Sequence, residues 1–202
     1  LVGVGVGAQG IKDLAELADG YKNLEARIKL VTGEGKAFDT AFAGVFEVAK
    51  RTNSAVQETG ELFTKLYEAG KLLGLSQQDA LNLTETINQS IQLSGASAQA
   101  SQAAIQQLVQ GLQGGALRGD EFNSVMEQSP RLAKALADGL GVTTGELRKL
   151  ADEGKLTSAT VISSLQKQSD TIASEFGKLP ATVGRAMTNL STEFTRYVGE
   201  AD

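Results

Sequence analysis

The sequence predicts an all-α protein: a compact multi-helix bundle of about ten short to medium helices, as a fragment of a longer helical protein. Proline occurs only at positions 130 and 180, while alanine, leucine, glutamine and glutamate fill the intervals between the 23 glycines. This composition favours helices. Strand signals are weak, because aromatic residues make up 5% of the chain and the one alternating apolar run is its glycine-rich start. One continuous helix of all 202 residues would span ~300 Å. The 23 glycines interrupt such a helix, so we expect shorter helices that fold back on each other as hairpins.

The first helix is expected over residues 11–31, where apolar side chains are spaced alternately by three and four. This spacing forms an a/d seam, but it covers fewer than three heptads. It therefore favours an amphipathic helix lying on a core over a coiled coil, unless the seam continues upstream. Residues 1–10 are expected to be a flexible lead or the end of an upstream segment. The seam consists of Leu14, Leu17, Tyr21, Leu24, Ile28 and Val31.

Three further helices follow, each with an apolar face. The second comes after the break "TGEGK", the third ends at "LLGLS", and the fourth begins with a capping box formed by Ser76 and Asp79. The apolar faces contain, in turn, Phe38, Phe42, Val45, Phe46 and Ala49; Leu62, Phe63, Leu66 and Tyr67; and Ala80, Leu83, Ile87 and Ile91.

The second half of the chain predicts six more helices. A Gln/Ala helix begins after "SGASAQ" and ends at "QGGAL", and shorter helices are expected over 120–128, 130–140, 144–153 and 158–176. Ser129 is an N-cap before a proline at the first helical position, and Thr143 with Glu146 forms a second capping box. A last helix after Pro180 places one apolar face along Val183, Met187, Leu190, Phe194 and Tyr197 or Val198.

The absence of cysteine and histidine excludes much enzyme chemistry. Neither a disulfide framework nor a serine–histidine or cysteine–histidine nucleophile can be built from this chain alone, and histidine-ligated zinc is excluded too. Two carboxylate pairs remain, Asp120 with Glu121 and Asp152 with Glu153. Neighbours on a helix point about 100° apart, so these pairs predict solvated surface. We therefore expect no catalytic residue, no cofactor and no metal site, and hence no enzyme.

The charge balance also argues against nucleic acid and membranes as partners. A net charge of −5 repels phosphate backbones and anionic lipid surfaces. The longest run without charge, residues 86–117, is long enough to cross a bilayer, but its eight glutamines would have to lose their hydration in lipid. No transmembrane segment is expected in this fragment.

The stretch "GGALRGDEFNSVMEQSP", residues 114–130, predicts a joint between helices. Its Arg-Gly-Asp triplet matches an adhesion motif, but the structural explanation is better: the chain turns at Gly119, and Asp120 caps a helix that presents Phe122 inward. The joint would fix how the Gln/Ala helix stacks on the helices after it. Its residues are Gly114, Gly115, Gly119, Phe122, Pro130 and Gly141.

Two candidate interaction surfaces accompany the joint. Arg118, Asp120 and Glu121 are the exposed charges best placed to select a partner. The charge-free Gln/Ala face is the second candidate, since glutamines can pair across chains. The alternative is that this face packs inside the molecule. Its polar members are Gln106, Gln110 and Gln113.

A helix-turn-helix DNA-binding module around residues 132–153 is an alternative. Ala137, Gly141 and Leu147 have the spacing with which such modules pack two helices across a tight turn. Between Thr143 and Lys155, however, three basic and three acidic residues cancel. The spacing predicts the geometry but not DNA recognition.

The ordered motifs from Ser94 to Leu156 carry a resemblance to a known family. "SGAS" precedes the Gln/Ala helix and is followed by "LRGDEFNSV", "PRLAKALADGLGV" and "GELRKLADEGKL". "ARIKLVTG", "LFTKLY" and "FGKLPATVGRAMTNLSTEFTRYVGE" flank them, so that the similarity covers about residues 20–200. This pattern resembles the N-terminal conserved domain of tape measure proteins of tailed bacteriophages and prophages.

The resemblance implies a structural and assembly role in the phage tail. Family members are long helical proteins, made in the host bacterial cytoplasm, that lie in the lumen of the tail tube, set tail length and leave with the DNA. Their expected partners are tail tube, tail tip or tail assembly chaperone proteins, together with self-association through helices of the full-length protein. The helical part of a tail-associated lytic enzyme is a further alternative. Residues 11–202 would form a globular head on the measuring rod, with a possible subdivision into 11–113 and 114–202.

Overall fold

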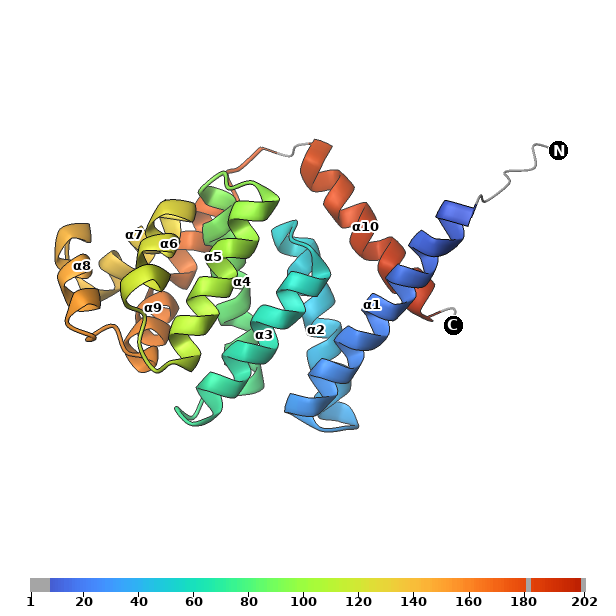
Figure 1. Ribbon diagram of the computed structural model, residues 1–202, viewed down its shortest axis with the longest axis horizontal. Coiled ribbons are helices and arrows are strands. Elements are labelled where there is room, and N and C mark those ends of the chain that lie inside the picture. The colour runs from blue at the N-terminus through green and yellow to red at the C-terminus, as the bar shows by residue number, and fades with distance from the viewer. Residues whose placement is uncertain (1–7, 181–182, 201–202) are drawn as a thin grey trace.

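The protein folds into ten α-helices in the part of the chain that its computed structural model describes, residues 8–180 and 183–200, excluding the side chains of 8–11 and 183–187 (Figure 1). The helices are α1 (Ala8–Thr32), α2 (Lys36–Thr52), α3 (Val56–Lys71), α4 (Gln77–Leu93), α5 (Ala98–Gln113), α6 (Gly119–Gln128), α7 (Pro130–Leu140), α8 (Thr144–Asp152), α9 (Ser158–Phe176) and α10 (Val183–Glu200). The all-α prediction is thus confirmed.

Local sequence signals place most helix ends correctly. Both capping boxes are present: the Ser76 hydroxyl accepts from the Asp79 amide at 3.1 Å, and the Thr143 hydroxyl accepts from the Glu146 amide at 3.2 Å. Helix α1 begins at Ala8, three residues before the predicted start. The rest of the predicted flexible lead, residues 1–7, lies outside the described residues.

The buried apolar side chains form two clusters. The smaller cluster joins α1 and α2, where Leu24, Ile28 and Val45 are buried, and the larger one is built from α4 to α9. Helices α3 and α4 contribute to both clusters. Phe63 and Leu81 belong to the smaller cluster, whereas Leu62 and Leu83 belong to the larger one.

The predicted packing of α1 as an amphipathic helix on a core is confirmed for Tyr21, Leu24, Ile28 and Val31, which are buried in the smaller cluster, whereas Leu14 near the start of the helix is 36% exposed. The subdivision into 11–113 and 114–202 stays a prediction.

A buried polar group connects three helices of the two clusters. The Asn88 side chain on α4 is 2% exposed, and its Nδ2 donates to the Thr59 hydroxyl of α3 at 3.0 Å and to the Thr52 hydroxyl of α2 at 3.4 Å. An amide without these acceptors would be costly at this depth. The network therefore favours one relative placement of α2, α3 and α4.

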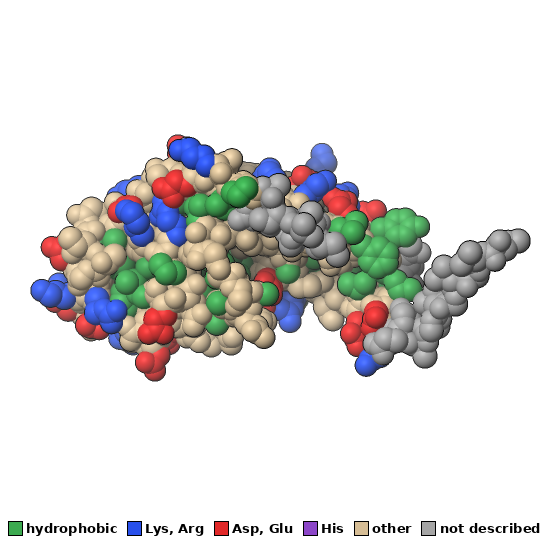
Figure 2. Space-filling model, turned by 90° about the horizontal axis from the view of Figure 1, so that it is seen from above, with side chains coloured by type: hydrophobic (Ala, Val, Ile, Leu, Met, Phe, Trp, Pro, Cys, Tyr) green, Lys and Arg blue, Asp and Glu red, His purple; other side chains and the backbone are tan. Residues whose placement is uncertain are grey.

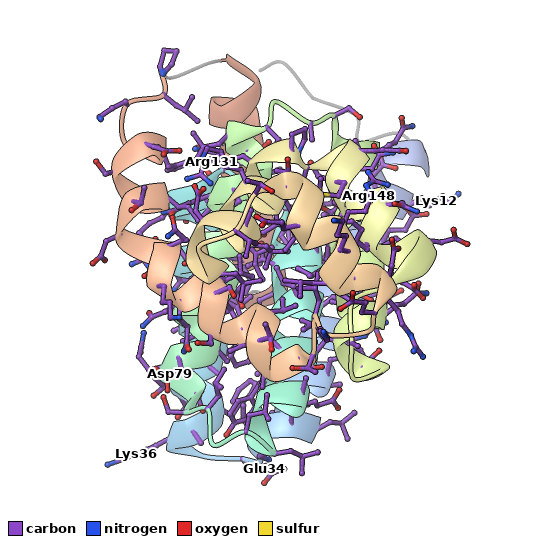
Figure 3. The ribbon with its side chains drawn as sticks, turned by 90° about the vertical axis from the view of Figure 1, so that its left-hand side faces the viewer. Lys12, Glu34, Lys36, Asp79, Arg131 and Arg148 are labelled. Atoms are coloured by element: carbon purple, nitrogen blue, oxygen red, sulfur yellow. The ribbon has the colours of Figure 1, made fainter. Side chains whose placement is uncertain are left out.

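Helices α7 and α9 approach each other closely in the larger cluster. A Cβ atom on Gly139 would lie 2.7 Å from the carbonyl carbon of Ser164, which belongs to the α9 backbone. At the other end of the pair, Arg131 Nε and Nη2 donate to the two carboxylate oxygens of Glu175 at 2.6 and 3.1 Å. This ion pair lowers the pKa of Glu175 below its usual value. Arg131 is labelled in Figure 3, which views the end of the molecule where α7, α8 and α9 lie.

Helix α10 crosses back to the far end of the molecule and packs on α1 and α2 (Figure 1). Its apolar residues share one face, as predicted for the part whose side chains are described, but this face points to solvent: Leu190 is 63%, Phe194 45% and Tyr197 72% exposed. The side chains of the other predicted members, Val183 and Met187, lie outside the described residues.

Candidate functional site

The joint is held by a short pairing of two extended segments. Ala116 and Thr157 form an antiparallel β-bridge, in which the Leu117 amide donates to the Leu156 carbonyl at 2.8 Å and the Ser158 amide donates to the Gly115 carbonyl at 3.0 Å. The chain therefore leaves α5 and returns to α9 at the same place. Helices α6, α7 and α8 form an excursion between the two paired segments.

The predicted capping role of Asp120 is wrong. The N-cap of α6 is Arg118, with φ −153° and ψ 169°, and α6 begins at Gly119 without a side-chain cap hydrogen bond. The bridge keeps the chain extended through Arg118, and the turn at Gly119, φ 57°, starts the helix before Asp120 is reached. Asp120 lies instead in the first turn, where its charge is favourable near the positive end of the helix dipole.

Phe122 anchors α6 and connects it to α8. The ring is 1% exposed, and the guanidinium carbon of Arg148 lies 6.0 Å from the ring centroid. Arg148 Nη1 also donates to the Asn123 side-chain oxygen at 3.1 Å. Arg148, labelled in Figure 3, is one of the three basic residues considered for DNA contact. Its guanidinium already binds α6.

Helix α7 begins and ends at the residues that the sequence predicts. Pro130 is the first residue of α7, and Ser129 is its N-cap residue, but the Ser129 hydroxyl makes no cap bond and lies 3.1 Å from the Ser94 hydroxyl. At the other end, Gly141 adopts φ 70°, the left-handed conformation that commonly ends a helix. Ala137 and Leu147 are buried on the two sides of this turn, as their spacing predicts.

The glutamines of α5 line a cleft of about 340 Å³ between α5 and α3. Gln106, Gln110 and Gln113 are exposed along this cleft, whereas Ile105 and Val109 are buried at its base. The apolar side chains of the Gln/Ala helix therefore pack inside the molecule, while these glutamines face outward.

Charged side chains of α3 form the opposite wall of this cleft. Glu58, Glu61 and Lys65 line it, and Glu58 is half-buried. Burial raises the pKa of Glu58, and the negative charge of Glu61 raises it further. The sequence analysis missed these residues, although their spacing of three and four places them on one helical face. Only the packing of α3 against α5 brings them to the glutamines.

The two candidate surfaces are separate. Arg118 and Asp120 are exposed and Glu121 is half-buried at the start of α6, and none of the three lines the glutamine cleft. Arg118 Nη1 lies near Gly154 instead, 3.9 Å from where a Cβ atom would stand. The structure thus offers one charged surface at the joint and one mixed cleft, not a single site.

Neither a metal-binding cluster nor a membrane-spanning helix occurs in the described residues. Among them, no group of three or more histidine, cysteine, aspartate or glutamate residues is placed to hold a metal ion. In the same residues, no helix is long and apolar enough to span a bilayer. Glu153, from one of the carboxylate pairs, makes an ion pair with Lys155 at 2.7 Å, which lowers the pKa of Glu153.

Comparison with known proteins identifies one matching family. No curated protein sequence and no solved structure matches the chain. A family model described as "Tape measure protein" matches residues 12–202, and so covers all ten helices except the first turn of α1. The helical fold and this match over nearly the whole chain lead to one conclusion: the protein belongs to the tape measure family, whose members are structural proteins of the phage tail and not a known enzyme family.

Proposed function

We propose that this chain is the globular head of a tape measure protein and acts in tail assembly by docking to other tail proteins. The full-length protein would set tail length and occupy the lumen of the tail tube before DNA ejection, after synthesis in the cytoplasm of the host bacterium. Its partners would be the tail tube, the tail tip or a tail assembly chaperone, and its helices would also associate with further copies of the protein.

The compact fold of the ten helices carries this proposal. The longest of them, α1, has 25 residues, which corresponds to ~38 Å at ~1.5 Å per residue. Successive helices fold back and share buried clusters, so the chain occupies far less length than one extended helix of the same residues. Such a unit is suited to docking at one end of the tail rather than to measuring its length.

An in-frame deletion in the full-length gene tests the head proposal. Removing residues 12–202 deletes about 190 residues, which as an extended helix would shorten the tail by ~290 Å. We expect tails that fail to assemble, or that differ in length by much less than this value. Electron microscopy of tails measures both outcomes. Shortening by the full ~1.5 Å per deleted residue would contradict a head that lies outside the ruler.

Charge reversal at the joint tests the docking surface. The double variant Arg118→Glu with Asp120→Lys keeps the net charge and changes only exposed groups. We expect it to lose co-purification with one of the three candidate tail proteins, tested one at a time. The matched control is Lys149→Glu with Asp152→Lys, which reverses two exposed charges on α8. Equal binding by both double variants would exclude Arg118 and Asp120 as selective contacts.

A variant of the glutamine cleft tests the second surface separately. Gln110→Arg places a bulky cation in the cleft beside Glu58 and Glu61, where it should fill the space that a partner would need. Loss of binding here, with binding retained in the Arg118 and Asp120 variant, would assign docking to the cleft.

The DNA-binding and lytic alternatives make different predictions. A DNA-binding module requires affinity for duplex DNA that falls steeply as salt rises, whereas the head proposal predicts little affinity at physiological salt. A lytic role requires cell-wall hydrolysis that is lost in Glu121→Gln or Glu153→Gln. Either result would displace the docking proposal.

A further inference from the structure

The glutamine cleft is part of a longer groove between α3 and α5. Glu58 and Ile105 line both this cleft and a second hollow of about 390 Å³ beside the start of α3. Ala55 and Ala98, at the starts of the two helices, line the second hollow, whereas the cleft lies further along both helices. Helices α3 and α5 therefore run in the same direction along the groove (Figure 1).

The α5 wall of this groove is uncharged but rich in amide groups. Helix α5 contains no charged residue, and Gln102, Gln106, Gln110 and Gln113 line the cleft along it. In Figure 2, which shows the molecule from above, the surface near its middle, where both helices begin, is mostly tan, since uncharged side chains predominate there. The distance from Gln102 to Gln113 is ~16 Å along the helix axis, which is the length of about five residues of extended chain. Because amides donate and accept hydrogen bonds as peptide units do, this wall is suited to holding the backbone of such a segment.

The α3 wall is acidic at one end of the groove. Glu58 is half-buried and Glu61 is exposed there, and in the described part of the chain neither carboxylate forms an ion pair. Lys65, further along the same wall, pairs with Glu68 at 3.6 Å. A carboxylate that has lost part of its hydration is unfavourable without a cation beside it, and the raised pKa of Glu58 has this cause. A cation supplied from outside the chain would therefore be stabilised at this end of the groove.

We propose that the groove binds an extended segment of a partner tail protein, with a lysine or arginine side chain of that segment lying between Glu58 and the glutamines of α5. The two glutamates select the basic side chain by charge, and they repel an acidic segment. The glutamine amides hold the backbone on either side of it. The inference rests on the proposed docking function and deepens it, because it states the chemistry of the partner at the cleft.

A library of capped pentapeptides displayed on beads tests the selection by charge. The central residue is fixed as lysine, arginine, norleucine or glutamate, and the other positions are mixtures of uncharged residues. We expect the purified chain to bind the lysine or the arginine library at least ~10-fold more tightly than the norleucine library, and the glutamate library least. Glu58→Gln should reduce the preference for basic peptides below ~2-fold.

Glu127→Gln is the matched control for the net charge of the chain. It removes an exposed carboxylate on α6, outside the groove, and should keep the full preference for basic peptides. Equal preference in the Glu58→Gln and Glu127→Gln variants would overturn the inference, because the overall negative charge would then explain the binding. Glu58→Gln should also leave the melting temperature unchanged or raise it. A fall of more than ~4 °C would show that Glu58 has a partner inside the molecule, and would overturn the inference as well.

Competition in solution separates a protein segment from a free amine. The n-butylammonium ion carries the charge of a lysine side chain without a peptide backbone, so at least ~10-fold more of it than of a soluble lysine pentapeptide should be needed to displace the beads. Gln110→Ala should weaken binding of every basic peptide, whereas Gln99→Ala, at an exposed position of α5 outside the groove, should not. Displacement at equal concentrations, or equal binding by the two glutamine variants, would overturn the assignment to a peptide segment.

The result can be separated from the test of the docking function. The library uses the purified chain alone, whereas co-purification uses the candidate tail proteins. Co-purification without a preference for basic peptides would overturn this inference and leave the docking function standing. A preference that depends on Glu58, without co-purification of any candidate, would support the chemistry of the groove and overturn docking to a tail protein.

Discussion

Replacing Gly139 with alanine tests the close approach of α7 and α9. The added methyl group would lie 2.7 Å from the Ser164 carbonyl carbon, and because that atom belongs to the backbone, one helix must shift. Overpacking of this kind costs ~1–3 kcal/mol, and a backbone contact favours the upper end of the range. Alanine gains ~1 kcal/mol of helix propensity over glycine. The expected net loss is therefore ~2 kcal/mol, or a fall of ~4–8 °C in melting temperature.

Gly145→Ala provides the matched control for this prediction. Gly145 is exposed within the first turn of α8, and the nearest atom to an added Cβ lies 3.9 Å away. The same chemical change should stabilise the protein there by ~0.5 kcal/mol. Urea unfolding followed by circular dichroism at 222 nm measures both variants. If Gly139→Ala is as stable as Gly145→Ala, then α7 and α9 do not approach as closely as described.

Three further predictions concern polar contacts. Glu175→Gln should lower the free energy of unfolding at pH 7. The ion pair with Arg131 lowers the pKa of the Glu175 carboxyl in the folded state, so the pair stabilises the fold fully at pH values above the unfolded-state pKa of ~4.3. This contribution disappears as the pH falls through the folded-state pKa. Urea unfolding between pH 7 and pH 3 should show the two proteins converging, and a constant difference would argue against the ion pair. Thr59→Val removes a hydrogen-bond acceptor of the buried Asn88 amide on α4 and should lower the free energy of unfolding by ~1–2 kcal/mol. The control is Thr64→Val, which removes a hydroxyl that donates within α3 and should lower the free energy of unfolding by less than ~0.5 kcal/mol in the same assay. Thr143→Ala should cost ~1 kcal/mol through loss of a capping box, but Asp120→Ala should cost less than ~0.5 kcal/mol in thermal melts; equal losses would restore the capping role of Asp120.

Local signals in the sequence were sufficient for most of the helices. The capping boxes at Ser76 and Thr143 and the proline at position 130 mark helix starts by hydrogen bonds within a few residues. Asp120 shows the limit of this approach. Its neighbourhood resembles a cap, but the start of α6 is set by the bridge to Thr157, which lies far along the chain.

The candidate site was only partly accessible to sequence reasoning for the same reason. The exposure of Gln106 and Gln110 follows from the helical pattern of α5, but the acidic wall formed by Glu58 and Glu61 depends on the contact between α3 and α5. The orientation of α10 is a stronger example. Its apolar face is visible in the sequence, yet only the burial of Thr192 and Thr195 against the rest of the protein shows that this apolar face is turned outward.

The bridge between Ala116 and Thr157 has a mechanical consequence. Together with the bond from the Ser158 hydroxyl to the Leu112 carbonyl at 2.7 Å, it clasps the end of α5 to the start of α9. Tension applied along the polypeptide can pass across this clasp, and the loop of three helices that it closes is shielded from the load until the clasp opens. Pulling on the two ends of the chain would therefore separate α6, α7 and α8 only after these three hydrogen bonds have broken.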